Sequence, residues 1–301
     1  MKLVFLGSGG SWPTKERNLS SIALKMNGEI ILFDCAEGTQ RQLFFSSLNF
    51  MHVEKILISH FHGDHFLGIP GLIQSMYLND RTKELNIYGP KGTTDIVKGI
   101  LTLGYFSPTF EILTHDLKDG DEVNFENYDI RVRGADHDIP ALAFCIEEHP
   151  RKGKFFPEKA LALGVEEGPL FRELQNGNSV KVGERIVKPE EVLGEPRRGR
   201  KVVYSGDTRP TQAIIELAEN CDVLIHDATL GQDLEEKAIR YGHSSAAQAA
   251  KIAKQSNAKV LFLTHISPRY GDAQILEDEA KKVFRYSFIA VDFLEHEIQL
   301  P

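Results

Sequence analysis

The stretch Lys55-Ile56-Leu57-Ile58-Ser59-His60-Phe61-His62-Gly63-Asp64-His65 determines the fold that we expect for this chain of 301 residues. It opens with a lysine and three consecutive apolar residues rich in β-branching, which is typical of a buried strand. Three histidines and one aspartate follow within six residues, and residues 66 to 73 then indicate a turn that enters a helix. We therefore expect the cluster at the carboxyl end of a strand, where open α/β sheets bind their ligands.

The side chains of this cluster are metal ligands by type. Imidazole nitrogen and carboxylate oxygen suit zinc and related divalent ions. Four such groups on one tight loop are too many for one face of one ion, so two ions a few ångströms apart could share them. The same placement, a short apolar run followed by His or Asp, recurs along the chain at Asp34, His137, Asp207, His226 and His265. The spacing alone does not decide which histidine would bind which ion.

Composition narrows the class of protein. The chain is 42% hydrophobic and 26% charged, an ordinary globular balance, and its net charge of −8 means that any nucleic-acid surface must be a local basic patch. Its three cysteines, Cys35, Cys145 and Cys221, are scattered and odd in number, which argues against a disulfide framework. No apolar run approaches the roughly 20 residues of a membrane span, so we expect a cytoplasmic protein without a membrane partner.

Local signals place individual elements. Asn27-Gly28 lies between two apolar runs and predicts a β-hairpin turn. Ser245 and Gln248 have the spacing of a capping box and predict the start of a helix.

The segment from about 149 to 199 differs from the rest of the chain. Gly, Pro, Lys, Arg and Glu dominate it, and apolar periodicity is lost. Such a length is unusual for a connection inside a compact domain, so we expect a single domain over 1–301 with an inserted arm at about 149–199. Basic residues flank the arm, and they could either contact phosphates or only solubilise the surface. They are Arg151, Lys152 and Lys154 at its entrance and Arg197, Arg198, Arg200 and Lys201 at its exit.

The pattern His60-x-His62-x-Asp64-His65 resembles the signature of the metallo-β-lactamase superfamily. The resemblance implies an α/β fold, a four-layer αβ/βα sandwich, with two Zn²⁺ per subunit, although Mn²⁺ or Fe²⁺ could also bind such ligands. It also implies the ligand sets, which are His60, His62 and His137 for the first ion, Asp64, His65 and His265 for the second, and Asp207 as the bridge. Asp34 is better placed to orient a ligand histidine from outside.

Three further motifs resemble the ribonuclease Z family. Pro13-Thr14-Lys15-Glu16-Arg17-Asn18 is similar to its Pro-x-Lys-x-Arg-Asn loop, and His243-Ser244-Ser245 to its His-Ser-Thr element. His226-Asp227-Ala228-Thr229 is similar to its His-Glu-Ala-Thr element, with an aspartate that is one methylene shorter. Whether Asp227 still reaches the histidine that it would orient is open at this point. The likeness extends over nearly the whole chain and includes Gly164 to Leu170 of the arm.

This family resemblance implies an endonuclease that cuts precursor tRNA after the discriminator nucleotide and leaves a 3′-hydroxyl on the tRNA. It further implies a homodimer in which the arm of one subunit clamps tRNA for the active site of the other. Asp64 would orient or deprotonate the attacking water, and His243, held by Asp227, would donate a proton to the leaving oxygen. The residues expected to contact phosphates are Lys15, Arg17, Arg151, Lys152, Lys154 and Arg269.

Two other functions remain possible at this point. A hydrolase of small phosphodiesters, lactones or thioesters with the same fold would keep every metal ligand, but the basic loop at 13–18 and the arm argue against it. A nucleic-acid-binding module with a structural metal would close its site with four ligands, often thiolates. Seven His and Asp candidates and no cysteine converge here, which argues against such a module.

Overall fold

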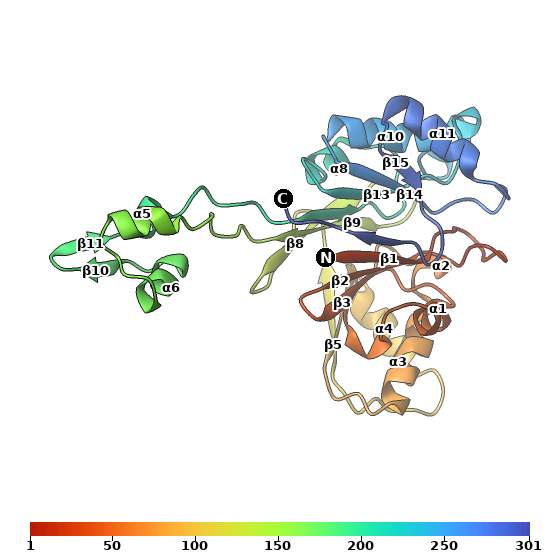
Figure 1. The fold of residues 1–301 in the computed structure, drawn as a ribbon. Helices are drawn as coiled ribbons and strands as arrows, with labels where there is room; N and C mark the ends of the chain where they lie inside the picture. Colours follow the sequence, from red (N-terminus) through yellow and green to blue (C-terminus); the bar gives the residue numbers. More distant parts are fainter. The chain divides into compact units, whose positions relative to one another are not determined.

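The computed structural model describes residues 1–301 and divides into two units, one formed by 1–147 with 201–299 and the other by 148–200 with 300–301. In the larger unit, two sheets pack face to face and helices cover their outer faces (Figure 1). This arrangement confirms the four-layer αβ/βα sandwich. No helix combines the length and apolar character that crossing a bilayer requires.

The first sheet contains seven strands and combines an antiparallel half with a parallel half. Its spatial order is β16 (Glu295–Glu297), β1 (Lys2–Gly7), β2 (Ser21–Met26), β3 (Glu29–Phe33), β4 (Val53–Leu57), β5 (Leu85–Pro90) and β6 (Ile112–Leu117). Strands β3 to β6 run parallel. The predicted hairpin is confirmed, because Asn27 and Gly28 join β2 to β3 with φ values of 49° and 86°.

The second sheet also has seven strands, and three of the seven candidate ligands, His137, Asp207 and His265, follow its strands. Its spatial order is β15 (Ser287–Ile289), β14 (Val260–Thr264), β13 (Val223–Asp227), β12 (Lys201–Tyr204), β9 (Ala141–Glu148), β8 (Tyr128–Ala135) and β7 (Glu122–Asn124). Strands β12 to β15 are parallel, whereas β9 pairs with β12 in the antiparallel direction.

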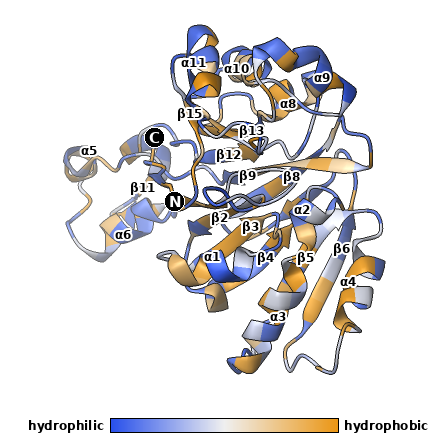
Figure 2. Cartoon of the chain, turned by 90° about the vertical axis from the view of Figure 1, so that its right-hand side faces the viewer, coloured by the Kyte–Doolittle hydropathy of each residue, from blue (hydrophilic) through white to orange (hydrophobic).

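Alternating side chains of the strands build three cores. In β1, Leu3 and Phe5 point into the core between the two sheets, while Val4 and Leu6 point into the core beneath the outer helices. Both faces of this strand are therefore apolar, which is why it is a continuous hydrophobic run rather than an alternating one. Figure 2 shows hydrophobic colour concentrated on the strands and hydrophilic colour on the outer faces of the helices.

Helices cover each sheet on its outer side. Those over the first sheet are α1 (Thr39–Phe45), α3 (Ile69–Leu78) and α4 (Thr93–Leu101), with the short η1 (Phe50–His52) and α2 (Gly63–Phe66) between strands. Those over the second sheet are α8 (Gln212–Leu217), α10 (Ala246–Gln255) and α11 (Gln274–Val283), with η2 (Gln232–Leu234) and α9 (Glu235–Arg240) before α10. The predicted capping box is present, since Ser245 Oγ accepts from the Gln248 backbone N–H at 3.2 Å.

The smaller unit, 148–200, has secondary structure and a core of its own. It contains α5 (Pro157–Ala162), α6 (Pro169–Gln175), β10 (Val180–Val182), β11 (Arg185–Val187) and α7 (Pro189–Val192). Each of its three helices begins with a proline, whose missing N–H costs nothing at that position. Val165, Phe171 and Leu174 are among the seven buried residues of its core. This segment therefore does contain apolar residues that form a core, but each apolar run is short.

Candidate metal centre

Residues from the carboxyl ends of strands in both sheets converge on one cluster. The first sheet contributes the loop after β4, and the second contributes the segments after β8, β12 and β14. The ligand atoms fall into four groups, in each of which all atoms lie within 4.8 Å of one another. These groups are His60 with His62 and His137, His60 with His65 and Asp207, Asp64 with His65 and His265, and Asp207 with His243 and His265.

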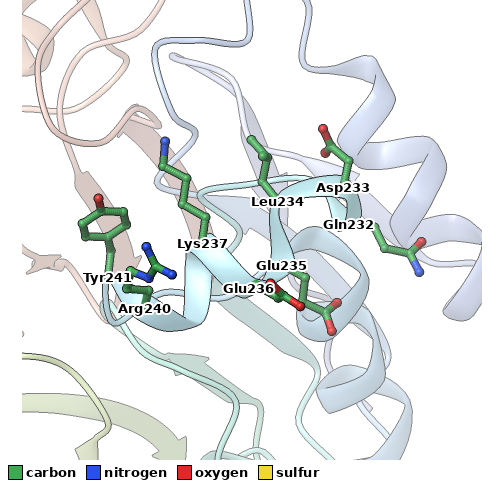
Figure 3. A pocket seen from close by; sticks show the side chains of 8 residues that line it. All are labelled: Gln232, Asp233, Leu234, Glu235, Glu236, Lys237, Arg240 and Tyr241. Carbon is green, nitrogen blue, oxygen red and sulfur yellow. The ribbon is translucent and has the colours of Figure 1, made fainter.

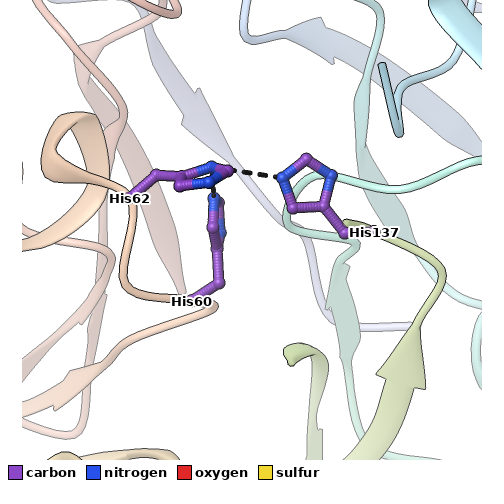
Figure 4. Close-up of side chains that lie close together, drawn as sticks. All are labelled: His60, His62 and His137. Carbon is purple, nitrogen blue, oxygen red and sulfur yellow. Dashed lines mark hydrogen bonds between the residues drawn. The ribbon is translucent and has the colours of Figure 1, made fainter. Parts of the chain in front are cut away.

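Three imidazoles form the first group (Figure 4). The Nδ1 of His62 lies 3.0 Å from His60 Nε2 and 3.2 Å from His137 Nε2. Burial, together with the neighbouring His65 imidazole, holds the pKa of His60 well below its usual value. A neutral imidazole keeps the lone pair that a metal ion needs. His60 is buried while His62 is exposed, so this group is open to solvent on one side.

Asp207 lies between the groups. Its Oδ2 is 3.7 Å from His60 Nε2, 3.3 Å from His65 Nε2 and 3.3 Å from His265 Nε2. Burial alone would raise the pKa of this carboxyl, but the imidazoles of His265 and His65 hold the pKa well below its usual value. The carboxylate is therefore ionised and stands where it can contact both sides of the cluster.

Asp64 completes the second group from the exposed side. Its Oδ2 lies 3.3 Å from His265 Nε2 and 3.9 Å from His65 Nε2. The same oxygen accepts a hydrogen bond from the backbone N–H of Ser11 at 2.7 Å. This bond fixes the carboxylate against the loop that follows β1.

Hydrogen bonds to the outer ring nitrogens hold four of the histidines. His60 Nδ1 lies 3.0 Å from Ser59 Oγ, and His65 Nδ1 lies 2.7 Å from Asp34 Oδ2. On the side of the second sheet, His137 Nδ1 lies 2.8 Å from the Gly242 carbonyl oxygen, and His265 Nδ1 lies 2.8 Å from Thr229 Oγ1. Each bond sets the tautomer and leaves Nε2 directed at the cluster, as metal-binding histidines require.

The donor set fits divalent cations. His65 Nε2 and Asp207 Oδ1 are buried and have no hydrogen-bond partner, although buried polar atoms normally have one. The ring nitrogens of His60, His62 and His137 also meet at 3.0 and 3.2 Å, close enough for one cation to bind all three. Cations would satisfy both features, because every group offers nitrogen or oxygen donors of the kind that zinc accepts.

His243 and Asp227 form a pair at the edge of the cluster. His243 Nδ1 lies 2.9 Å from Asp227 Oδ2, so the shorter aspartate does reach the histidine. Burial alone would lower the pKa of His243, but the Asp227 carboxylate raises it to about 9. Asp227 also accepts hydrogen bonds from the backbone N–H groups of Thr208, Thr229 and Ser244, which fix its orientation.

Backbone strain and close contacts mark the same place. Asp34 and His265 have φ values of 57° and 59°, in the left-handed region that costs a non-glycine residue energy and that clusters at functional sites. Gly10 packs against the His265 ring, and a Cβ at Gly10 would lie 2.3 Å from that ring. A larger residue at this position would displace the histidine.

A cavity of about 520 Å³ borders the first histidine group. The ends of β5 and β6 and the turn between β8 and β9 line it. Two lysines, Lys91 and Lys118, and two aspartates, Asp119 and Asp138, also line it, so its charged residues of both signs are balanced. A larger hollow of about 590 Å³ lies along η2 and α9 and includes no ligand residue. It contains Asp233, Glu235 and Glu236, with Arg240 and Tyr241 at one end (Figure 3).

The basic residues expected to bind phosphates lie in different environments. Lys15 and Arg269 are exposed, and Arg269 Nε also donates to Ser267 Oγ at 3.2 Å. Arg17 turns inward instead, because its Nη1 donates to Ser8 Oγ at 2.7 Å and to the Ala290 carbonyl. The guanidinium of Arg17 therefore holds the loop in place.

The basic residues of the arm have partners within the arm unit. Arg151 Nη2 donates to the Pro301 carbonyl at 3.1 Å, and Lys152 Nζ donates to the Asn176 carbonyl. Lys154 Nζ lies 5.8 Å from the centre of the Phe156 ring, and Arg200 forms an ion pair with Glu148 at 2.6 Å. In the larger unit, Lys201 is buried, so the basic cluster expected at the exit of the arm is smaller than the sequence indicates.

Sequence reasoning missed the groups that position the ligands. Tyr204 donates from its hydroxyl to Asp34 Oδ2 at 2.6 Å, and Thr229 and the Gly242 carbonyl contact ligand histidines. Tyr204 lies three residues before Asp207 at the end of an apolar run, which is the signal that could have identified it. A backbone carbonyl such as that of Gly242 leaves no signal in a sequence.

Comparisons with known proteins agree with this geometry. Residues 1–137 match the family model described as anti-Pycsar protein Apyc1, and residues 188–266 match the β-lactamase superfamily domain. The ribonuclease Z of Methanosarcina acetivorans is 47% identical over 300 residues, which cover 99% of this chain and 98% of that protein. The ribonuclease Z of Methanothermobacter thermautotrophicus is 46% identical over 299 residues, which cover 99% and 97%.

Among solved structures, the short form of human tRNase Z is similar over 100% of both chains, with a TM-score of 0.73 and 28% identity. The family that the three sequence motifs resemble is therefore the family that full-length similarity identifies. This chain belongs to the ribonuclease Z family of endoribonucleases with the metallo-β-lactamase fold.

Proposed function

We propose that this chain removes the 3′ trailer from precursor tRNA by hydrolysing one phosphodiester bond and leaving a 3′-hydroxyl on the tRNA. The observation that carries the proposal is the 47% identity to a ribonuclease Z along 99% of the chain. The convergence of eight His and Asp residues, the seven candidate ligands and His243, supports a hydrolytic centre.

The centre would hold two divalent cations, of which zinc is the first candidate and Mn²⁺ or Fe²⁺ the alternatives. His60, His62 and His137 would bind one ion, and Asp64, His65 and His265 the other. Asp207 would bridge them, because its Oδ2 lies within 3.7 Å of nitrogens on both sides. Such a pair supplies an activated water and neutralises charge on the phosphoryl oxygens.

The side chains around the centre would then control the proton movements. Asp64, held by the Ser11 N–H, would orient the attacking water or accept its proton. His243 would donate a proton to the departing 3′-oxygen of the tRNA, which is a poor leaving group without one. Asp227 would keep the His243 ring in position through the bond to Nδ1, leaving Nε2 for the substrate.

The proposed function is tested with a labelled precursor tRNA and the purified chain, with and without a chelator. Cleavage directly after the discriminator nucleotide, a 3′-hydroxyl on the tRNA, and complete loss of cleavage with chelator are expected. Hydrolysis of bis(p-nitrophenyl) phosphate without any cut in the precursor would replace this proposal with a small-molecule hydrolase.

Replacing the proton donor should slow the chemical step. We expect His243→Ala to lower the single-turnover rate on precursor tRNA by roughly 10²- to 10⁴-fold, because an unprotonated alkoxide leaves slowly. Metal content, measured by mass spectrometry, should stay at the wild-type level. His52→Ala, at an exposed histidine that ends η1, is the matched control. Weaker tRNA binding with an unchanged single-turnover rate would remove the proton-donor role from His243.

Weakening the support of His65 should weaken metal binding. In Asp34→Asn, an amide replaces one of the oxygens that accept from Ser59, Tyr204 and His65, so we expect roughly 10- to 100-fold lower zinc affinity. Competition with a fluorescent chelator measures this change. Asp80→Asn is the control, because Asp80 has the same left-handed backbone but is exposed. Equal affinities of wild type and Asp34→Asn would contradict a supporting role for Asp34.

We also propose that the arm is a tRNA-binding element and that the chain acts as a homodimer. The arm folds around a core of its own, and β9 and β12 pair up to Glu147 and Lys201, where the arm leaves and re-enters. Phe44 and Phe45 of α1 are 61% and 65% exposed in the single chain. Exposed aromatic side chains of this kind are typical of a surface that a second subunit covers.

Removal of the arm should separate tRNA recognition from hydrolysis. A variant in which Asn-Gly replaces residues 149–199 closes β9 and β12 as a tight hairpin. We expect its affinity for precursor tRNA, measured by filter binding, to fall at least about tenfold because phosphate contacts are lost. Hydrolysis of bis(p-nitrophenyl) phosphate should persist. Undiminished tRNA affinity would exclude the arm as a binding element. Light scattering on the wild type and on this variant measures their molar masses and so tests the proposed homodimer.

A further inference from the structure

The loop that follows β1 is anchored directly to the metal centre. The Ser11 N–H donates to Asp64 Oδ2 at 2.7 Å, and the Gly10 N–H donates to the Ile266 carbonyl at 3.1 Å. The absent Cβ of Gly10 leaves the room that the His265 ring occupies. The backbone directly before Trp12 therefore touches residues on both sides of the second ligand group.

The far end of the same loop is also fixed. The Thr14 N–H donates to the Arg17 carbonyl at 2.9 Å, and the Arg17 guanidinium is held by Ser8 Oγ and the Ala290 carbonyl. The Asn18 N–H donates to Asp292 Oδ2 at 2.7 Å. The backbone that carries Trp12 is therefore anchored on both sides, at Gly10 and Ser11 and again from Thr14 to Asn18.

Trp12 lies between these anchors and is exposed. Its backbone N–H donates to the Gly10 carbonyl at 2.9 Å, yet 62% of the residue is accessible to solvent. It is the only tryptophan in the chain. Trp12 is one residue from the Ser11 N–H that binds Asp64, so the exposed indole belongs to a backbone segment anchored at the candidate metal centre.

We propose that Trp12 stacks on a nucleobase of the RNA next to the scissile phosphate, which deepens the proposed function and rests on it. Single-stranded RNA is commonly held by stacking of unpaired bases on aromatic side chains. Unpaired nucleotides flank the cleavage site of a precursor that carries a 3′ trailer. With the phosphate at the metal centre, we expect a neighbouring base to reach the indole. The exposed Lys15, three residues later, adds a positive charge to the same loop.

The single tryptophan allows the contact to be observed directly. In stopped-flow measurements with excess wild-type enzyme, precursor tRNA should quench the Trp12 fluorescence in a phase that precedes cleavage. A series of precursors with one abasic nucleotide, at the discriminator or at each of the first trailer positions, identifies the partner. We expect one abasic position to abolish the quench while the others retain it.

A mutant cycle between protein and RNA measures the coupling. On the intact precursor, Trp12→Ala should lower kcat/KM roughly 5- to 100-fold, the range expected for one base–aromatic stack. On the precursor that is abasic at the partner position, the same substitution should have little further effect. Trp12→Phe should recover most of the loss, whereas Trp12→Leu, which keeps apolar area without an aromatic face, should not. Tyr105→Ala, at a fully exposed aromatic elsewhere, is the control.

The outcomes separate this proposal from the function on which it depends. The stacking role is wrong if the wild type cuts precursor tRNA at the expected nucleotide but its fluorescence is not quenched. It is also wrong if Trp12→Ala lowers kcat/KM equally on the intact and the abasic precursors. If Trp12→Ala changes the oligomeric state and shows no coupling to the abasic position, the ring belongs to a protein interface, and the stacking role is also wrong. Failure of the wild type to cut any precursor refutes the proposed function itself.

Discussion

The carboxylate of Asp34 is the interaction on which the geometry of the centre depends. It accepts hydrogen bonds from the Ser59 N–H and Oγ at 2.7 and 2.8 Å, from His65 Nδ1 at 2.7 Å and from the Tyr204 hydroxyl at 2.6 Å. Tyr204 belongs to the second sheet and the other partners to the first, so one buried group ties the two sheets together. A buried carboxylate needs such partners, and meeting that need fixes the ring of His65 as well. A residue outside the four ligand groups thus sets their alignment.

The positions of the candidate ligands could be predicted from the sequence because their side-chain types are distinctive and their strands are apolar. Parallel strands end at the same edge, so residues such as His60, Asp207 and His265 had to meet once both sheets formed. Their supporting partners could not be predicted. Tyr204 and Thr229 are ordinary residues that become relevant only through contacts between distant segments. Arg17 shows the same limit, since a basic loop motif does not reveal that its guanidinium turns inward.

The arm illustrates a different limit of sequence patterns. Its helices contain four to seven residues, which is too short for a 3.6-residue repeat to be recognised, so the sequence of the segment shows no helical periodicity. Yet Pro157, Pro169 and Pro189 each begin a helix, and the buried Val165, Phe171 and Leu174 lie near them. Proline spacing was therefore the better signal here than hydrophobic periodicity.

The distribution of the ligand residues over both sheets links cation supply to the survival of the folded chain. Asp64 and His265 lie 201 positions apart in sequence, so bringing them together in the unfolded chain costs loop-closure entropy. A cation bound by both residues would act as a cross-link that favours the native state over the unfolded chain. Above the dissociation constant, each tenfold increase in free cation then adds about 1.4 kcal/mol per ion to the folding equilibrium. Starvation for the ion would therefore reduce the amount of intact protein as well as its turnover, through proteolysis of the loosened chain.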